Sequence, residues 1–570
     1  MPASTSGPQV KTSFLEQVKG YDRVFWICIW MELMERMAYY GVRLVVPVYL
    51  VLAKTDGGPG LTHVEKGTIL ACWAATQSWL PTFSGGFSDR YGYKRSLVAA
   101  ALLKASGYAL MALAGDFWGM LLGTQLLATG TGVFKPGIQG TMAHSIVRVP
   151  GGASLGWGLF YQSVNIGAAV SAYIPMVTRD VYGWPSVFWA CTLLVLSNLI
   201  PLIFYEDPQD ERQTQKDQRS LGTLVYESVR ELVTSPVLLG FIFISAGFWF
   251  LFHQIFDMLP NFVDDWVDSS KLLAVMGQAL GKESWIQEAS QGVQIPQERL
   301  LNLNAILIMT TMWIFAWASG KIRVLLSTAL GMGLATGSLL FLIGGASVWT
   351  VLLAIVVFTV GEMLSSPKKQ EYMTELAPPG KRALFLGYAN MPDGIGWVLG
   401  SLVAGNMYEQ KGDKVNLGRR FLDEHASTDS ARGWIDGFAQ AAAGKTDALW
   451  TEKAIEEATK RAHDELGLSG EAPQVAEALR AIPDADVTGA VAEVIPRGHV
   501  IDFIVAHVPT LPDGTATTAA TLRDWMFHAY DPGQVWFPFF VSGAVSVVLM
   551  LLYDRWVRSR NRRLKELAAA

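Results

Sequence analysis

Residues 32 to 43 carry charged and hydroxyl-bearing side chains inside an otherwise apolar stretch, residues 24–51. A charged side chain near the centre of a bilayer costs about 2.5–3.5 kcal/mol, so such groups face a protein interior or a watery cavity. Carboxylates can bind and release protons, and guanidinium groups can hold a carboxylate by two hydrogen bonds. The charged members are Glu32, Glu35, Arg36 and Arg43.

These residues share one side of a helix. At 100° per residue, the four charged groups together with Tyr39 and Tyr40 occupy an arc of about 140°. The other side carries Met34, Met37, Ala38 and Gly41. The sequence therefore predicts a polar stripe on a membrane helix that is turned away from lipid and toward a pathway for polar solutes.

The composition agrees with a membrane protein. The chain has 570 residues, of which 51% are hydrophobic and 17% are charged, whereas soluble domains carry about 25% charged residues. The net charge of −5 gives no reason to expect a nucleic-acid partner. Cys28, Cys72 and Cys191 lie in apolar runs, which indicates buried thiols and not a disulfide framework. Residues 1–20 are polar, and we expect no cleavable signal peptide.

Twelve apolar segments have about the 20 residues that a helix needs to cross a bilayer. They predict an all-α membrane protein with two bundles of six helices. The segments cover residues 22–52, 65–87, 95–114, 117–144, 154–177, 184–205, 236–264, 299–319, 322–344, 348–373, 380–408 and 534–556.

Five regions follow from this pattern. We expect them at residues 1–205 (N-terminal bundle), 206–235 (linker), 236–408 (helices 7–11), 409–533 (insertion) and 534–570 (helix 12 with a basic tail). Lys and Arg gather in alternate loops, which predicts cytoplasmic termini and a cytoplasmic linker. These basic residues are Arg90, Lys94, Arg95, Arg148, Lys321, Arg323, Lys368, Lys369, Lys381, Arg382 and, in the tail, Arg555, Arg558, Arg560, Arg562 and Arg563.

The polar insertion between helices 11 and 12 is expected outside the cytoplasm. Residues 447–466 and 473–481 are Ala-rich and amphipathic, which predicts helices. A small helical cap and a module that binds a protein partner both remain open as interpretations.

One loop motif and one helix motif each resemble a motif of a known protein family. Gly85-Gly-Phe-Ser-Asp-Arg-Tyr-Gly-Tyr-Lys-Arg-Ser96 resembles the cytoplasmic loop motif of the major facilitator superfamily. The residues that would control its conformational role are Gly85, Asp89, Arg90, Gly92, Lys94 and Arg95. The stripe Glu32-x-x-Glu35-Arg36-x-x-Tyr39-Tyr40-Gly41 closely resembles the first-helix motif of the proton-dependent oligopeptide transporter family, with Met37 where Phe is usual.

Further matches follow in family order and cover both bundles. They are Gly130-Thr-Gly-Val-Phe-Lys-Pro136, Phe160-Tyr-Gln-Ser-Val-Asn-Ile-Gly167, Leu303-Asn304 and Gly361-Glu-Met-Leu-Ser-Ser-Pro367. Lys135 needs an anionic partner inside the membrane, and Glu32, Glu35 and Glu362 are available. An ion pair between Lys135 and one of these carboxylates could couple protons to transport. It could also be a static ion pair, which adds little net stability.

The resemblance implies roles for these residues. Proton coupling would involve Glu32, Glu35, Arg36, Lys135, His253 and Asp257. A peptide's carboxylate would bind Arg36 and Lys135, and its amine would bind Glu362. The full set expected to bind substrate is Arg36, Tyr39, Tyr40, Arg43, Lys135, Asn165, Trp249, Asn304, Glu362 and Ser366. For the asparagines, an ordinary interhelical hydrogen bond is an open alternative.

The chain departs from the family pattern in helix 7 and helix 2. His253 stands where the family has a Glu that pairs with the residue matching Arg43. Asp257 lies one turn later, and we expect it to replace that Glu, with His253 as a neighbour that responds to protons or that merely hydrogen-bonds within the bundle. Ser78 stands where the family commonly has a substrate-facing Tyr, and Asp393 has no family role.

The leading hypothesis is a proton-coupled symporter of di- and tripeptides that works by alternating access. The alternatives are a same-fold transporter of another small anion or drug-like molecule, and a receptor or scaffold that does not transport. No predicted span holds a metal-ligand cluster or a nucleophile–base pair, so we expect no enzyme, no metal and no cofactor. The protein is expected to be a monomer in the plasma or inner membrane, with small peptides, protons and lipid as partners.

Overall fold

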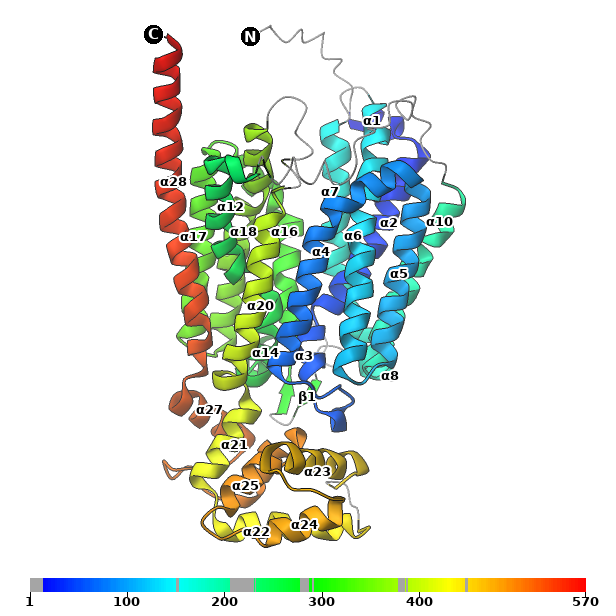
Figure 1. Ribbon diagram of the computed structural model, residues 1–570. Coiled ribbons are helices and arrows are strands. Elements are labelled where there is room, and N and C mark those ends of the chain that lie inside the picture. The colour runs from blue at the N-terminus through cyan, green and yellow to red at the C-terminus, as the bar shows by residue number, and fades with distance from the viewer. Residues whose placement is uncertain are drawn as a thin grey trace.

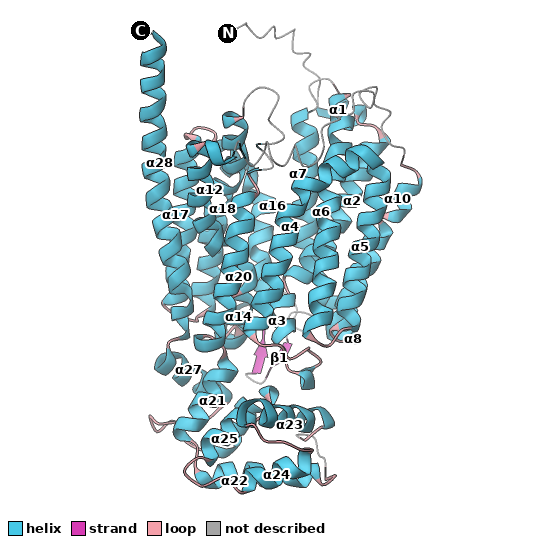
Figure 2. Ribbon diagram, viewed as in Figure 1, coloured by secondary structure: helices cyan, strands magenta, loops and turns pink. Residues whose placement is uncertain are grey.

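The computed structural model describes residues 14–149, 153–205, 230, 232–276, 287–289, 292–377, 385, 388–445 and 450–569. Helices make up most of the described chain (Figure 2). They form two bundles and a smaller group of helices at one end (Figure 1).

The first bundle contains the polar stripe. Its elements are α1 (Phe14–Gly20), α2 (Arg23–Arg43), α3 (Val46–Val51), η1 (Lys54–Asp56), α4 (His63–Tyr91), α5 (Tyr93–Leu113), α6 (Phe117–Val147), α7 (Ala153–Ser171), α8 (Tyr173–Tyr182), α9 (Pro185–Ser197) and α10 (Leu199–Ile203). Helix α2 packs against α7 and α9, and α6 packs against α4 and α5.

The second bundle follows the linker. Its elements are α12 (Pro236–Phe252), α13 (Gln254–Asp257), α14 (Leu259–Trp266), α15 (Ser270–Met276), β1 (Gln287–Ala289), β2 (Gly292–Gln294), α16 (Gln297–Ser319), α17 (Val324–Ile343), α18 (Val348–Leu376), α20 (Met391–Lys411), η5 (Pro532–Trp536) and α28 (Phe537–Ala569). The two bundles meet where α4 packs against α20 and α7 packs against α16. The antiparallel pair β1–β2 was not predicted from the sequence.

Several predicted spans are divided in the structure. The segment 22–52 breaks between α2 and α3, and Pro47 lies in the first turn of α3. The segment 236–264 breaks into α12, α13 and α14, and Pro260 lies in the first turn of α14. Proline lacks the N–H that a continuous helix needs, so it marks the break after α2 and the break before α14. As a result Arg43 and Asp257 are each the last residue of a helix.

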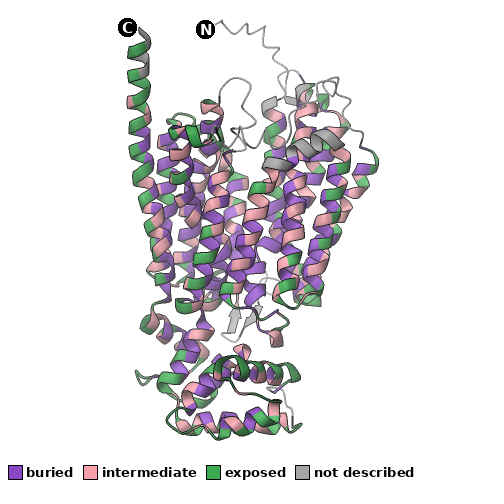
Figure 3. Ribbon diagram, viewed as in Figure 1, coloured by how far each residue is buried: buried purple, intermediate pink, exposed green. Residues whose placement is uncertain are grey.

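Within the described residues, seven helices are long and apolar enough to cross a membrane by length and composition. They cover Tyr93–Leu113, Pro185–Ile203, Pro236–Asp257, Gln297–Ser319, Val324–Ile343, Val348–Leu376 and Pro532–Arg563. Helix α2 is outside this set because its charged stripe lowers its hydropathy. Exposed positions occur along both bundles (Figure 3). They include large apolar residues such as Trp118, Leu193 and Trp313, as expected of surfaces that face lipid.

The chain between α20 and η5 forms the third group of helices. They are α21 (Lys414–His425), α22 (Thr428–Ala442), α23 (Glu452–Leu466), α24 (Ala472–Arg480), α25 (Val487–Val494), η4 (Arg497–His499), α26 (Val500–His507) and α27 (Ala519–Tyr530). Trp434, Phe438 and Trp450 form an aromatic cluster among them. Helices α21 to α25 lie at the opposite end of the molecule from α1 and the C-terminal end of α28 (Figure 1).

Candidate functional site

The polar stripe of α2 is inside the protein. Glu32, Glu35, Arg36, Tyr39 and Arg43 are all buried. The Arg36 Nε lies 3.3 Å from Glu32 Oε1 and also pairs with the Glu35 carboxylate. The Arg36 guanidinium lies 4.8 Å from the centre of the Tyr39 ring. Tyr40, which is half-buried, packs edge-on against Tyr39, so the whole stripe faces the bundle interior.

The ammonium group that pairs with Glu35 comes from Lys104, on α5. The motifs in the sequence pointed to Lys135 and not to Lys104, although Lys104 also interrupts an apolar run. Lys135 is on α6, is partly accessible, and has no ion pair or hydrogen bond within the part of the chain that the structure describes. The expected pairing of Lys135 with Glu32, Glu35 or Glu362 is therefore absent from this conformation.

The opposite bundle supplies one carboxylate near the middle of α18. Asn304 Nδ2, on α16, donates to Glu362 Oε2 at 2.9 Å and to the Thr359 hydroxyl at 3.0 Å. Glu362 is only half-buried, and the Ser366 hydroxyl one turn later has no hydrogen-bond partner among the described groups. Glu362 thus has a hydrogen bond from an amide but no cation beside it in the described chain.

The fifth-helix motif positions α7 against the stripe. A Cβ added at Gly167 would lie 2.8 Å from the Arg36 Cβ and 2.9 Å from the Leu33 carbonyl oxygen, so only glycine permits this approach. Asn165 Nδ2 donates to the Tyr161 carbonyl oxygen of its own helix at 3.0 Å. The asparagine therefore makes an intrahelical hydrogen bond here, while the glycine sets the distance between α2 and α7.

The second polar centre joins the two bundles at the ends of α2 and α13. The Arg43 guanidinium pairs with the Asp257 carboxylate, and both side chains are buried. Asp257 Oδ2 also accepts hydrogen bonds from Trp397 Nε1 (2.9 Å) and from the Ser401 hydroxyl (2.7 Å). The pairing predicted for Arg43 and Asp257 is present in the structure.

His253 contacts this centre through the ring of Trp397. Its imidazole stacks on Trp397, with ring centres 4.5 Å apart, and its Nε2 has no hydrogen-bond partner among the described groups. Trp249 lies beside His253 and under the Lys369 ammonium group, 4.2 Å from it. Lys369 pairs with Asp393, which gives a partner to a carboxylate that had no assigned role.

Other links between the bundles lie near α3, α8 and α14, at the end of the bundles that faces α21 (Figure 1). These links are Lys66 Nζ to Asn261 Oδ1 (2.8 Å), Asn261 Nδ2 to Pro47 O (3.0 Å), Gln297 Nε2 to Leu44 O (3.0 Å), Arg179 Nη2 to Glu298 Oε1 (2.9 Å) and Arg299 Nη2 to Asp180 Oδ2 (3.1 Å). The bundles are therefore held together at this end.

The insertion is anchored at the same end. Asp413 accepts hydrogen bonds from both terminal nitrogens of Arg497, at 2.8 and 2.7 Å. The His63 Nε2 lies 3.6 Å from the Asp413 carboxylate, and the His63 backbone N–H donates to Glu409 at 2.5 Å. The insertion thus contacts the first bundle at the start of α4 as well as the second bundle that it extends.

The loop motif between α4 and α5 is described in part. Gly85, Asp89 and Arg90 lie in α4, and their side chains fall outside the described residues. Gly92 has φ of 95°, which favours glycine, and Lys94 Nζ donates to the Tyr205 carbonyl oxygen at 2.8 Å. Arg95 is exposed. The basic residues Lys368 and Lys369, which were assigned to a loop, lie buried within α18 and pair with Glu371 and Asp393; Lys381 and Arg382 lie outside the described residues.

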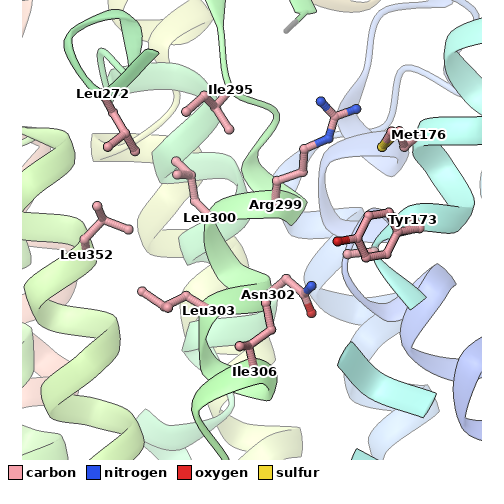
Figure 4. Close-up of a pocket in the computed structure, with 11 residues that line it drawn as sticks. Tyr173, Met176, Leu272, Ile295, Arg299, Leu300, Asn302, Leu303, Ile306 and Leu352 are labelled. Carbon is pink, nitrogen blue, oxygen red and sulfur yellow. The ribbon is translucent and has the colours of Figure 1, made fainter. Parts of the chain in front are cut away.

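A cavity of about 300 Å³ lies between α8 and α16 (Figure 4). Its walls are mostly apolar, with Tyr173 and Met176 on one side and Leu300, Leu303 and Ile306 on the other. None of the residues predicted to bind substrate lines it. It is therefore separate from the polar site between Arg36 and Glu362.

The family model described as Major Facilitator Superfamily matches residues 31–401. The chain belongs to the Major Facilitator Superfamily. This membership and the long apolar helices support an integral membrane protein, and the proteins to which the chain is similar are named as permeases and transporters.

Curated relatives are peptide permeases. The chain is 27% identical over 237 residues to dipeptide and tripeptide permease A of Serratia proteamaculans (strain 568), which covers 41% of this chain and 44% of the relative. It is 30% identical over 193 residues to dipeptide and tripeptide permease B of Aliivibrio fischeri (strain MJ11), 33% of this chain and 37% of the relative. The matches thus span less than half of these relatives. They confirm the resemblance to peptide transporters.

Solved structures share the fold. A peptide transporter POT in complex with sulfate superposes with a TM-score of 0.57 at 18% identity, over 72% of this chain and 93% of that one. A POT family transporter in complex with 5-aminolevulinic acid gives a TM-score of 0.55 at 16% identity, over 69% and 92% of the two chains.

Proposed function

We propose that the protein is a proton-coupled symporter of di- and tripeptides that works by alternating access. The observation that carries this proposal is the division of charge between the bundles. Arg36 and the partly accessible Lys135 lie on the first bundle, and Glu362 lies on the second. A short peptide has a carboxylate that can bind Arg36 and Lys135 and an amine that can bind Glu362. Binding of the peptide therefore draws the two bundles together.

The peptide ends have matching chemistry on each side. Arg36 can hold a carboxylate by two parallel hydrogen bonds, and Lys135 adds a compact charge without an ion pair of its own in the described chain. Glu362 can accept from an ammonium group while keeping its hydrogen bond from Asn304. Tyr39 and Tyr40 supply ring faces beside Arg36, against which a substrate side chain can pack.

Proton coupling would act through the ion pairs of α2. Protonation of Glu32 or Glu35 removes the negative charge that holds Arg36, which leaves the guanidinium available for a substrate carboxylate. The same reasoning applies at Arg43 and Asp257, where protonation of the carboxylate would release a contact between the bundles. Each step links proton binding to a change of partner, which coupling requires.

Alternating access would use the Arg43–Asp257 pair as the gate on the side of the insertion. In this conformation that end is closed by the pair and by the neighbouring links between bundles. We propose that all six long helices of each bundle cross the bilayer and that both termini are cytoplasmic. The segment 409–533 then forms a helical cap outside the cytoplasm. The transporter would work as a monomer, with the proton gradient and no cofactor.

The direct test is uptake of labelled dialanine by proteoliposomes that contain the purified protein. We expect an inward proton gradient to drive accumulation, and Glu362→Gln to reduce it strongly because the amine loses its carboxylate. Asp554→Asn is the matched control, since Asp554 pairs with Arg323 inside one bundle (3.1 Å). No uptake by the wild-type protein under a gradient would contradict the proposal.

A second candidate is transport of a small anion without an amine. The cationic side of the site favours it, because Arg36, Lys104 and Lys135 outnumber Glu32 and Glu35 on the first bundle. Ser78, which stands where the family commonly has a tyrosine, packs closely against α20: a Cβ added at Gly394 would lie 2.8 Å from the Ser78 Cβ. Saturable uptake of an anion that lacks an amine, with none of dialanine, would decide for this candidate.

A further inference from the structure

Lys104 is a fully buried ammonium group near the centre of α5. Its side chain has no solvent exposure, and its Nζ pairs with the Glu35 carboxylate. The Tyr39 and Phe134 ring centres each lie 5.9 Å from the Nζ. A buried cation is costly unless it is paired, so Lys104 depends on Glu35 in this conformation.

The first glycine of the fourth-helix motif makes room for Lys104. A Cβ added at Gly130 would overlap the Lys104 Cγ and would lie 2.9 Å from the Ala100 carbonyl oxygen. The stem of Lys104 therefore occupies a slot on α6 that only glycine leaves open. Gly130 and Lys104 together bring the ammonium group to the α2 stripe.

The charges on this bundle pair in an uneven way. Glu32 lies beside Arg36, and Glu35 is shared by Arg36 and Lys104. Lys135 is left as the third cation, without an ion pair within the described residues. Other titratable groups around Lys104 are Glu32 and Tyr39 on α2, Lys135 on α6 and Cys191 on α9.

We propose that Lys104 is the resident counter-ion of Glu35, a positioning residue that keeps Lys135 free to bind the substrate's carboxylate. This inference deepens the proposed function and rests on it for the identity of the substrate. Without Lys104, Glu35 is left with only part of Arg36 and recruits Lys135 as a second cation. Binding of a carboxylate to Lys135 then competes with Glu35, and affinity for substrate falls.

The arrangement also favours coupling between a proton and an anion. Neutralising Glu35 with a proton leaves Arg36, Lys104 and Lys135 facing one carboxylate, Glu32, so the site attracts an anion more strongly. By linkage, a bound anion must raise the proton affinity of Glu35 to the same degree. Lys104 contributes to this effect because it stays charged in a place that substrate does not reach.

The experiment compares Lys104→Met with Lys135→Met, each alone and combined with Glu35→Gln. Equilibrium binding of labelled dialanine to the purified protein is measured, so that defects in proton movement do not enter. Lys135→Met should raise Kd by about 10-fold or more, since a hydrogen bond between a charged group and the substrate's carboxylate is lost. Lys104→Met should raise Kd as well, because Glu35 then competes with the substrate for Lys135. Glu35→Gln should restore binding to the Lys104→Met protein, because Lys135 is released, but not to the Lys135→Met protein.

The thermal-unfolding midpoint of the same variants gives a readout that needs no substrate. Lys104→Met should lower the midpoint, and adding Glu35→Gln should recover part of the loss, since the buried carboxylate that lost one of its cations is gone. Rescue of neither Kd nor midpoint by Glu35→Gln would overturn the proposal. If the wild-type protein binds no dialanine, the peptide assignment fails, while rescue of the midpoint still supports Lys104 as the counter-ion and its absence refutes it.

Discussion

Replacing Asp257 with Asn should open the transporter on the side of the insertion. The amide keeps nearly the same shape and can still accept hydrogen bonds from Trp397 and Ser401, which lie 2.9 and 2.7 Å from Asp257 Oδ2. The change removes the charge that faces Arg43 and puts an amide NH₂ donor in place of Oδ1. It therefore isolates the ion pair between the bundles from the packing around it.

The free-energy cost of removing the Asp257 charge follows from the burial of the ion pair. Both side chains of the pair are almost inaccessible to solvent, and removing one partner of such a pair costs about 3–5 kcal/mol. When the gate opens, water reaches both groups, so the same change costs little in the open state. With a difference of about 3 kcal/mol, the population of the closed gate relative to the open gate falls roughly 100-fold.

Labelling of a cysteine in the gate measures this shift. Val45 is fully buried next to Arg43, and Val45→Cys can be introduced after Cys28, Cys72 and Cys191 are replaced with Ala. A membrane-impermeant thiol reagent should label this position much faster in the Asp257→Asn protein than in the parent protein. Asp554→Asn, whose ion pair lies within one bundle, should leave the rate unchanged.

Transport should change in parallel. Proton-driven uptake depends on the carboxylate of Asp257 as a proton acceptor as well as on gate closure, whereas counterflow needs no proton gradient. Asp257→Asn and Asp257→Ala should therefore impair uptake more than they impair counterflow. Unchanged labelling together with equal, negligible losses in the two transport assays would refute the gate assigned to Arg43 and Asp257.

Three further predictions concern other parts of the molecule. Glu362→Gln should raise the Kd of dialanine by about 10-fold or more, because a charged partner of the amine is lost, and leave an anion without an amine unaffected; equal effects on both ligands in equilibrium binding would count against Glu362 as the amine partner. Arg497→Ala should lower the free energy of unfolding of the insertion by about 3–5 kcal/mol, because Asp413 stays buried without its bidentate partner. Calorimetry should show a lower unfolding midpoint for this variant, whereas the matched surface change Arg480→Ala should leave the midpoint unchanged. Burial alone would raise the pKa of Asp413, but Arg497 and His63 outweigh it and hold that pKa well below its usual range, so the stabilisation is present above about pH 4 and is lost as the pH falls further; an acid titration of the midpoint that is unaffected by Arg497→Ala would contradict this.

The stripe and the order of the helices could be predicted from the sequence because lipid imposes strong rules. A charged residue such as Glu35 cannot face lipid cheaply, so its position on the helix reveals the interior side of α2. The Asp257 partner of Arg43 could be predicted for a related reason. A buried cation needs a carboxylate, and Asp257 was the nearest one to the position where the family has Glu.

Spacing alone could not predict that Glu35 pairs with Lys104 and not with Lys135. The partner of a buried charge depends on how closely two helices approach, and that approach is set by Gly130 and by the slot for Lys104. The breaks after Arg43 and Asp257 were missed because apolar residues continue through them, although Pro47 and Pro260 marked both places. The contact of the insertion with His63 depends on packing between segments that are far apart in the sequence.

We propose that a proton gradient drives a peptide through the site between Arg36 and Glu362. The most direct test of this proposal is the uptake of labelled dialanine into proteoliposomes, with and without an inward proton gradient, for the wild-type and Glu362→Gln proteins. We expect the wild-type protein to accumulate dialanine only with the gradient, and Glu362→Gln to lose most of this accumulation. Accumulation that does not depend on the gradient, or that is unchanged in Glu362→Gln, would contradict it.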